Sequence, residues 1–193
     1  LVGIFGIGQK PTGSKDPFAL RRAAVSVIRI LQAMQASLSL HELLSSAKDQ
    51  YPPDIVAPDT SILVFEYVID RLRAWYQEQG IGVDVLRAVT ALKLDQPDDI
   101  DRRVQALNAF AASEDAVALA AANKRVANIL AKAEGEVMQN PDKQLLQAPE
   151  EQALFDALTT TDGALQELLK TQDYAAALMT LAALRAPVDA FFE

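Results

Sequence analysis

Residues 16–34 decide the fold class, and their sequence is DPFALRRAAVSVIRILQAM. Asp16 can accept hydrogen bonds from the free amides at a helix start, and Pro17 has a fixed φ that suits the first helical position. The apolar residues that follow recur at spacings of three and four, which place them on one face of a helix. They are Leu20, Ala24, Val27, Ile28, Leu31 and Met34. This stretch therefore predicts an amphipathic helix that starts at Asp16.

Helical spacing continues along most of the chain after this stretch. Residues 39–42 match a capping box, so a short helix is expected to start there. A longer helix is expected to begin near Asp59, after the two prolines at 52–53. The core stripe expected on that longer helix is Ile62, Phe65, Ile69, Leu72 and Tyr76. Further helices are expected near residues 83–91, 98–111, 114–133, 149–170 and 173–192. We therefore predict an all-α fold, arranged as a two-part helical array.

Two breaks in the helical pattern suggest how the array is divided. Residues 1–16 repeat glycine and contain a proline, so we predict a Gly-rich loop there, preceded by either a short apolar strand or a buried helix end. Residues 94–99 (LDQPDD) are polar and contain a proline, which is typical of a boundary. We predict a helical body over 17–92 and a helical bundle over 97–193. Because the chain opens at Leu1 and not at methionine, we expect it to be a segment of a longer protein.

Composition and charge restrict the possible sites. Cysteine is absent, which removes disulfides, thiolate metal ligands and thiol nucleophiles. The net charge of −8 opposes non-specific nucleic-acid binding, so an RNA-binding protein of this composition needs a local basic face. Neither a signal peptide nor an apolar run of about 18 residues is evident. We expect a cytoplasmic protein without a membrane partner.

The segment from Gly8 to Gly13 has two glycines at the separation found in phosphate-binding loops. That motif continues with lysine and then serine or threonine, whereas here Ser14 precedes Lys15. No alternation of strands and helices follows it. A turn that needs glycine is the favoured interpretation, and a phosphate-loop enzyme is the alternative.

Catalytic or metal chemistry has few residues to work with. His41 is the one histidine in the sequence, and it lies in the capping segment at residues 39–42. Acidic residues such as Asp98, Asp99, Glu150 and Glu151 stand at helix starts, where they interact favourably with the helix dipole. We therefore expect this chain to be non-catalytic by itself, with no metal or cofactor of its own.

A basic helix face is predicted within residues 119–132. At about 100° per residue, Leu119, Ala122, Val126, Ile129 and Leu130 share one arc and are expected in the core. Lys124, Arg125, Asn128 and Lys132 fall together on the opposite side, with no acidic residue among them. The alternative is that this side is an ordinary solvated helix face.

Arginine and aromatic residues also gather on other predicted helices. They are Arg21, Arg22 and Arg29 on the first long helix, Arg71, Arg73, Trp75 and Tyr76 on another, and Arg102 and Arg103 on a third. Arginine beside tryptophan or tyrosine can clamp phosphates and stack bases. Tyr76 lies on the core stripe and Trp75 flanks it, so packing is the favoured role for both.

Several stretches resemble one known family. They are residues 3–9 (GIFGIGQ), 16–24 (DPFALRRAA), 71–76 (RLRAWY), 121–130 (AANKRVANIL), 174–178 (YAAAL) and 187–192 (PVDAFF). Together, and in order from end to end, they resemble the β-subunit of bacterial glycyl-tRNA synthetase. The 121–130 segment also resembles the helical anticodon-binding domain of arginyl-tRNA synthetases.

The resemblance implies an aminoacyl-tRNA synthetase made of α- and β-subunits, which joins glycine to its tRNA using ATP and Mg²⁺. In that family the α-subunit carries the aminoacylation site. The β-subunit mainly grips tRNA, and its C-terminal helical domain is expected to approach the anticodon arm. Residues 97–193 would then be most of an anticodon-binding bundle, truncated at its end. The implied partners are glycine-specific tRNA and the α-subunit.

Six residues are the candidates for RNA binding. Lys124, Arg125 and Lys132 are expected to neutralise phosphates, and Asn128 is expected to bond a base edge or a sugar. Arg102 and Arg103 are further candidates. The alternative function is a helical protein–protein module that braces the α-subunit without direct RNA contact.

Overall fold

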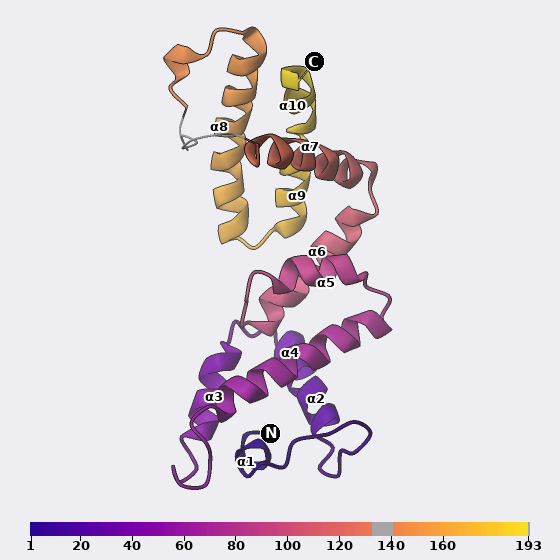
Figure 1. Ribbon diagram of the computed structural model, residues 1–193, viewed down its shortest axis with the longest axis vertical. Coiled ribbons are helices and arrows are strands. Elements are labelled where there is room, and N and C mark those ends of the chain that lie inside the picture. The colour runs from indigo at the N-terminus through magenta and orange to yellow at the C-terminus, as the bar shows by residue number, and fades with distance from the viewer. Residues whose placement is uncertain (133–140, 193) are drawn as a thin grey trace. The chain divides into compact units, whose positions relative to one another are not determined.

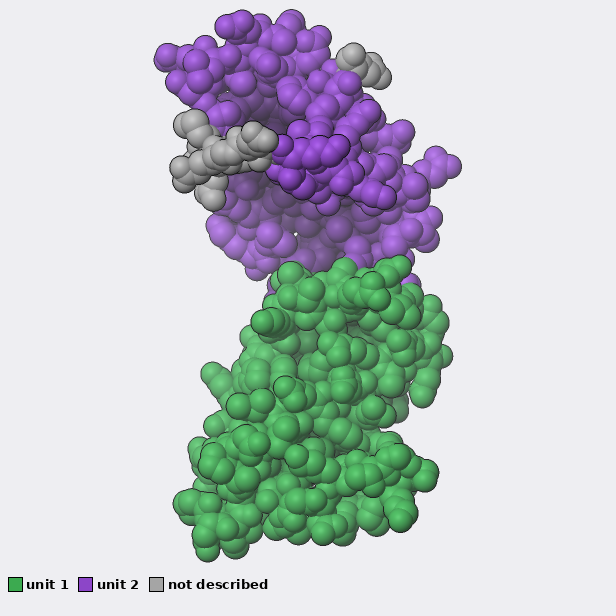
Figure 2. Space-filling model, viewed as in Figure 1, with its two compact units in different colours: residues 1–104 green, residues 105–193 purple. Residues whose placement is uncertain are grey.

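The computed structural model describes residues 1–132 and 141–192, and the regular elements within them are helices (Figure 1). The β pairing found in those residues is one isolated antiparallel bridge between Thr12 and Lys15. The prediction of an all-α fold is confirmed. The chain divides into two compact units, Leu1–Val104 and Gln105–Glu193 (Figure 2). The boundary between the units, between Val104 and Gln105, lies C-terminal to the predicted boundary at residues 94–99.

Unit 1 is built around one long helix, α4 (Thr60–Glu78). The other helices are α1 (Val2–Gly6), α2 (Leu20–Ala33), α3 (Leu40–Lys48), α5 (Val83–Thr90) and α6 (Pro97–Ala111), whose last residues belong to unit 2. Helix α4 packs against α1, α2, α3 and α5 (Figure 1). Its residues Val64, Val68 and Leu72 are at most 2% exposed, so α4 forms the centre of the core. Burying such a side chain stabilises the fold by about 1.5–3 kcal/mol.

Helix α1, with Val2 and Phe5 buried, precedes the glycine-rich turn within residues 1–16. Its glycines allow close packing: a Cβ on Gly3 would lie 2.6 Å from the Tyr51 hydroxyl oxygen. A Cβ on Gly6 would lie 2.7 Å from a methyl carbon of Val56. Sequence pattern cannot separate a glycine that makes a turn from one that permits such an approach.

Helix α2 begins at Leu20, later than predicted, although Asp16 has the predicted role. The two carboxylate oxygens of Asp16 accept hydrogen bonds from the amides of Leu20 (2.8 Å) and Arg21 (3.0 Å). The chain enters the helix through Ala19, which has a left-handed backbone with φ of 52°. The predicted stripe is buried at Leu20, Ala24, Ile28 and Leu31, whereas Met34 at the end of the helix is 67% exposed.

Replacing Asp16 with alanine should lower the thermal midpoint of unfolding at pH 7. The hydrogen bond from the Arg21 amide, with that from Leu20 and the nearby guanidinium groups, holds the pKa of Asp16 below its usual value. A depressed pKa stabilises the folded state above the unfolded pKa, and this contribution disappears as pH falls through the folded value. Thermal melts at several pH values should show the difference at pH 7 and its loss as pH falls through the lowered pKa of Asp16. Asp54→Ala is the control, since Asp54 is exposed in the loop before α4.

The buried side of α4 differs in part from the predicted stripe. Leu72 and Tyr76 are buried as predicted, together with Thr60, Val64 and Val68, but Ile62 is 55% exposed. The reason is that α4 contacts helices on several sides, so a rule derived for helices with one buried face does not fix its orientation.

Tyr76 is 1% exposed and joins three helices through its hydroxyl group. The hydroxyl donates to a carboxylate oxygen of Asp101 on α6 at 2.6 Å and accepts from the side-chain amide of Gln32 on α2 at 3.0 Å. Burial, and next the hydrogen bond to Asp101, raise the pKa of this hydroxyl. It therefore remains a hydrogen-bond donor throughout the physiological pH range, and the predicted packing role of Tyr76 is confirmed.

Tyr76→Phe should reduce the free energy of unfolding by about 1–3 kcal/mol, because it removes the hydroxyl from two hydrogen bonds and leaves the ring in place. Urea denaturation followed by circular dichroism measures this difference. Tyr51→Phe, at a site 43% exposed, is the matched control and should change the free energy by less than about 0.5 kcal/mol. Equal effects of the two substitutions would contradict the importance of the Tyr76 hydroxyl.

Unit 2 contains α7 (Glu114–Leu130), the short 3-10 helix Lys143–Leu145, α8 (Pro149–Lys170), α9 (Tyr174–Ala182) and α10 (Arg185–Phe192). Helix α8 packs against α9 and α10, and α7 packs against the same two helices (Figure 1). The buried hydrophobic residues of its described part are Tyr174, Ala177 and Ala182. Helix α7 contributes none, and its predicted core residues Ile129 and Leu130 are 48% and 50% exposed. Unit 2 therefore has a much thinner core than unit 1.

In the described part of the chain, one stretch, Tyr174–Phe192, is long and apolar enough by length and composition to cross a membrane, and 11% of it is buried. It consists of α9 and α10, which are separated by a turn at Ala183 and Leu184. With 9 and 8 residues, each helix is far shorter than the roughly 20 residues needed to span a bilayer. We therefore treat both as packed helices of unit 2.

Candidate nucleic-acid interface

Helix α7 provides the framework for the predicted basic face. It begins at Ser113, whose hydroxyl oxygen accepts a hydrogen bond from the Ala116 amide at 3.1 Å. Its acidic residues, Glu114 and Asp115, are confined to the first turn. From Ala116 to Lys132 the sequence contains no acidic residue. The rest of the helix therefore carries only positive charge.

All four predicted residues of this face are exposed, namely Lys124, Arg125, Asn128 and Lys132. Lys124, Arg125 and Asn128 lie on α7, whereas Lys132 lies in the turn that follows, because the helix ends at Leu130. None of the three cations forms an ion pair with a described residue. The face is thus a cluster of exposed cations, which we call the α7 basic face.

Arg125 has a defined neighbour within unit 2. Its guanidinium carbon lies 5.0 Å from the centroid of the Phe192 ring, a distance that permits a cation–π interaction. It also lines a depression of about 370 Å³ together with Arg185 and Asp189. Arg185 and Asp189 form an ion pair at 3.7 Å. The guanidinium group is therefore held against α10 while it remains exposed.

Arg102 and Arg103 occupy a different setting, in unit 1. Arg102 pairs with Asp98 at 2.9 Å, and Arg103 pairs with Asp99 at 3.0 Å. Both aspartates are buried, at 6% and 7% exposure, and a buried carboxylate needs such a partner. These ion pairs give the two arginines a structural role, and their contact with RNA stays a prediction.

The double substitution of Arg102 and Arg103 by glutamine should lower the free energy of unfolding by about 1–3 kcal/mol, because it leaves buried carboxylates without their cations. The same substitution at Lys124 and Arg125 removes two exposed charges and the Arg125–Phe192 contact, and should change stability by less than about 1 kcal/mol. Urea denaturation of the two double variants makes the comparison. A stable Arg102→Gln, Arg103→Gln protein would count against the structural assignment.

The segment from Gly8 to Lys15 forms a tight turn. Gly8 and Gly13 have φ of 77° and 50°, and the amide of Lys15 donates to the carbonyl oxygen of Thr12 at 2.8 Å. The first free amides of α2, which a phosphate would need, already donate to Asp16. This geometry favours the structural interpretation of the turn over the phosphate-loop alternative.

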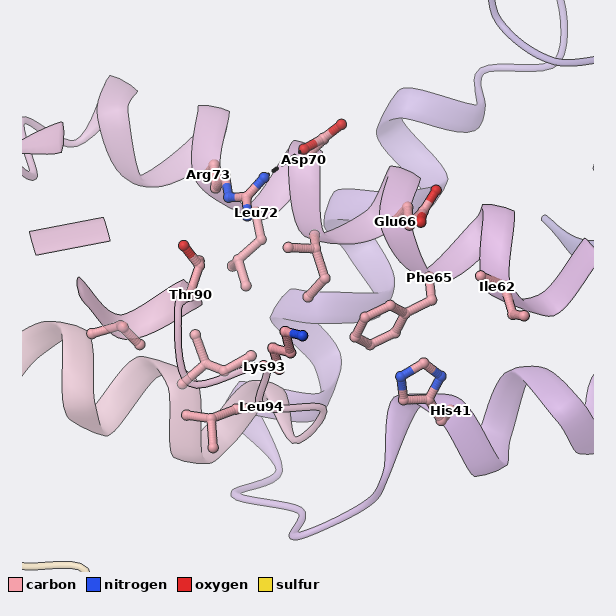
Figure 3. A pocket seen from close by; sticks show the side chains of 13 residues that line it. His41, Ile62, Phe65, Glu66, Asp70, Leu72, Arg73, Thr90, Lys93 and Leu94 are labelled. Carbon is pink, nitrogen blue, oxygen red and sulfur yellow. Dashed lines mark hydrogen bonds and ion pairs between the residues drawn. The ribbon is translucent and has the colours of Figure 1, made fainter. Parts of the chain in front are cut away.

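Figure 3 shows a pocket of about 540 Å³ in unit 1 that the sequence interpretation missed. Its lining includes Phe65 and Ile69 of α4, which the sequence pattern assigned to the core. The His41 ring stacks on Phe65 with centroids 3.8 Å apart. Glu66, Asp70, Arg73 and Lys93 line it as well, so its charges are balanced. Balanced charge does not favour a polyanion, and we exclude this pocket from the nucleic-acid interface.

Metal ligands are not gathered at any of these places. Among the residues that the structure describes, no group of three histidine, cysteine, aspartate or glutamate side chains is placed to hold a metal ion. The arrangement of unit 2 can bind an anion by charge, and it presents no paired nucleophile and base on α7.

Comparisons with known proteins show which proteins this chain resembles. Residues 1–91 match the family described as glycyl-tRNA synthetase beta subunit. The chain is 51% identical over 192 residues to a glycine–tRNA ligase beta subunit of Pseudomonas aeruginosa. Both comparisons support one family, the glycyl-tRNA synthetase beta subunit. Corresponding beta subunits of Chromohalobacter salexigens and Shewanella denitrificans are 49% and 47% identical over 193 residues.

The extent of these matches differs along the chain. The match to the glycyl-tRNA synthetase beta subunit family ends at residue 91, just after α5, whereas the alignments to the three relatives cover 100% of this chain. The chain spans 28% of the length of these relatives. The α7 basic face thus lies outside the family match and inside the region shared with the individual beta subunits.

Proposed function

We propose that this chain is the tRNA-contacting C-terminal part of a glycyl-tRNA synthetase β-subunit. Its identity of 51% to a glycine–tRNA ligase beta subunit over 192 residues supports the assignment to that enzyme. In this proposal the complete α/β assembly attaches glycine to its tRNA with ATP and Mg²⁺ in the cytoplasm. The aminoacylation site lies on the α-subunit, and the part described here contributes RNA contacts.

The α7 basic face carries this proposal. The protein has a net charge of −8, yet Ala116 to Lys132 contain three cations and no acid. The four polar residues of the face are exposed, and no described residue neutralises the cations by an ion pair. Such a concentration of free positive charge on an acidic protein suits a phosphate backbone.

The residues of the face have separate roles in the proposed contact. Lys124, Arg125 and Lys132 neutralise phosphates, which positions the RNA without reading its sequence. Asn128 lies one helical turn from Lys124 and can bond a base edge or a sugar hydroxyl. Its amide supplies both a donor and an acceptor. We propose the anticodon arm as the part of the tRNA that α7 meets, in line with the resemblance to arginyl-tRNA synthetases.

A second candidate function is supported by the exposed apolar side chains of unit 2. Val117, Leu145 and Met179 are 70%, 72% and 56% exposed. Apolar surface of this kind favours protein contact. Under this alternative the chain braces the α-subunit and makes no direct contact with RNA.

A titration of the chain with glycine-specific tRNA, followed by fluorescence anisotropy of labelled tRNA, tests the proposal. We expect Lys124→Ala, Arg125→Ala to weaken binding about tenfold and to reduce the dependence of log K on log salt by about 1.4–1.8. The control is Lys143→Ala, Lys170→Ala, which removes two exposed lysines of unit 2 that are paired with Asp156 and Glu167. This control should change binding by less than twofold.

The same titration separates the two candidate functions. A tRNA with an altered anticodon should bind more weakly if α7 meets the anticodon arm. The other outcome is that the wild-type chain binds tRNA no better than an acidic control protein at low salt, but binds the isolated α-subunit. This outcome would establish the bracing function instead.

A further inference from the structure

The first 41 residues are strongly basic in an acidic protein. They contain five basic residues and one acidic residue, and the next acid is Glu42. The basic residues are Lys10, Lys15, Arg21, Arg22 and Arg29. The single acid, Asp16, already accepts two amide hydrogen bonds at the start of α2. Unit 1 therefore has a positively charged segment of its own, in addition to the α7 basic face of unit 2.

Helix α2 places two of these arginines on its outer side. Arg22, Ser26 and Arg29 fall within about 60° of arc, opposite the buried residues of the same helix. All three are exposed, and neither arginine forms an ion pair with a described residue. Arg21 has a different role, since it donates a hydrogen bond to the carbonyl oxygen of Gly13 and ties the preceding turn to α2.

A shallow depression lies between this side of α2 and the end of α4. It has a volume of about 450 Å³. Its lining consists of Ser26, Arg29, Ile30, Gln32, Ala33 and Trp75. Ser26 and Arg29 thus belong both to the basic side of α2 and to the depression. Arg29 and Trp75 thus line one depression, whose volume is large enough for a nucleobase.

Trp75 lies next to a buried aromatic residue of the core. It is half-buried, and its ring centroid lies 5.1 Å from that of Tyr76. Tyr76 is fixed in turn by its hydrogen bonds with Gln32 and Asp101. A preorganised aromatic surface loses little conformational entropy when a flat ligand stacks on it.

We propose that α2 and Trp75 form a second RNA-contact surface, which takes an unpaired nucleotide. Arg22 and Arg29 neutralise phosphates, and the base stacks on Trp75 in the depression beside Arg29. Proteins that bind single-stranded RNA combine cations along the phosphate backbone with aromatic rings on which the bases stack. The proposal rests on the proposed function, because it takes RNA as the ligand of this chain.

The fluorescence of Trp75 reports on stacking at this site, since Trp75 is the one tryptophan in the sequence. The 193-residue chain is titrated with glycine-specific tRNA and with a single-stranded oligouridylate, and tryptophan emission is recorded. Stacking should quench this emission. The quenching by oligouridylate should persist in the Lys124→Ala, Arg125→Ala variant, because that variant changes only unit 2.

Charge and stacking are then removed separately. Arg22→Gln, Arg29→Gln should weaken oligouridylate binding about tenfold and reduce the salt dependence of log K by about 1.4. The matched control is Arg73→Gln, Arg87→Gln, which removes two arginines of unit 1 that pair with Asp70 and Asp84. This control should change affinity by less than twofold. Trp75→Leu should weaken binding about fivefold or more, with folding checked by circular dichroism.

The possible results separate this inference from the proposed function. Suppose that tRNA binding depends on Lys124 and Arg125, but that Trp75 emission does not change and Arg22→Gln, Arg29→Gln has the affinity of the wild type. This result overturns the second surface and leaves the proposed function intact. Quenching by polyglutamate as strong as that by oligouridylate overturns the assignment to RNA, because any polyanion would then suffice. The inference is supported if oligouridylate quenches the emission, if Arg22→Gln, Arg29→Gln abolishes this quenching, and if the matched control retains it.

Discussion

The buried hydroxyl group of Tyr76 connects three helices of unit 1. It donates to Asp101 on α6 and accepts from Gln32 on α2, and Gln32 also donates to the carbonyl oxygen of Pro97 at 3.4 Å. Inside a core such bonds are stronger than in water, and an unpaired partner is costly. The relative positions of α2, α4 and α6 therefore depend on this network. The depression beside Trp75 depends on it too, because α2 and α4 form its two sides.

The two units are stabilised in different ways. Unit 1 has a continuous core around α4, whereas the described part of unit 2 buries three hydrophobic side chains. Side-chain caps occur in both units; in unit 2, Ser113, Asp142 and Asp173 each accept a hydrogen bond from a backbone amide at a helix start. A capping interaction contributes about 1 kcal/mol, less than a fully buried leucine. Burial thus dominates in unit 1, and local interactions matter more in unit 2.

Acidic and basic residues have separate uses in this protein. Many carboxylates are engaged within the fold: Asp16 caps α2, Asp98 and Asp99 pair with arginines, and Glu151 accepts amide hydrogen bonds at the start of α8. The cations of α7 and of the outer side of α2 have no such partners among the described residues. A net charge of −8 therefore coexists with two exposed basic surfaces. Local charge, not total charge, decides whether a phosphate backbone can approach.

The sequence by itself determined the all-α fold and most of the buried stripe of α2. These features follow from the 3.6-residue helical period, which is a local property of the chain. Only the tertiary structure decided the buried side of α4, the packing role of Gly3 and Gly6, and the pairing of Arg102 and Arg103 with buried aspartates. It alone also brought Trp75 and Arg29, 46 positions apart in the sequence, to the lining of one depression. Contacts between distant segments depend on how several helices pack at once, and helical periodicity carries no information about that.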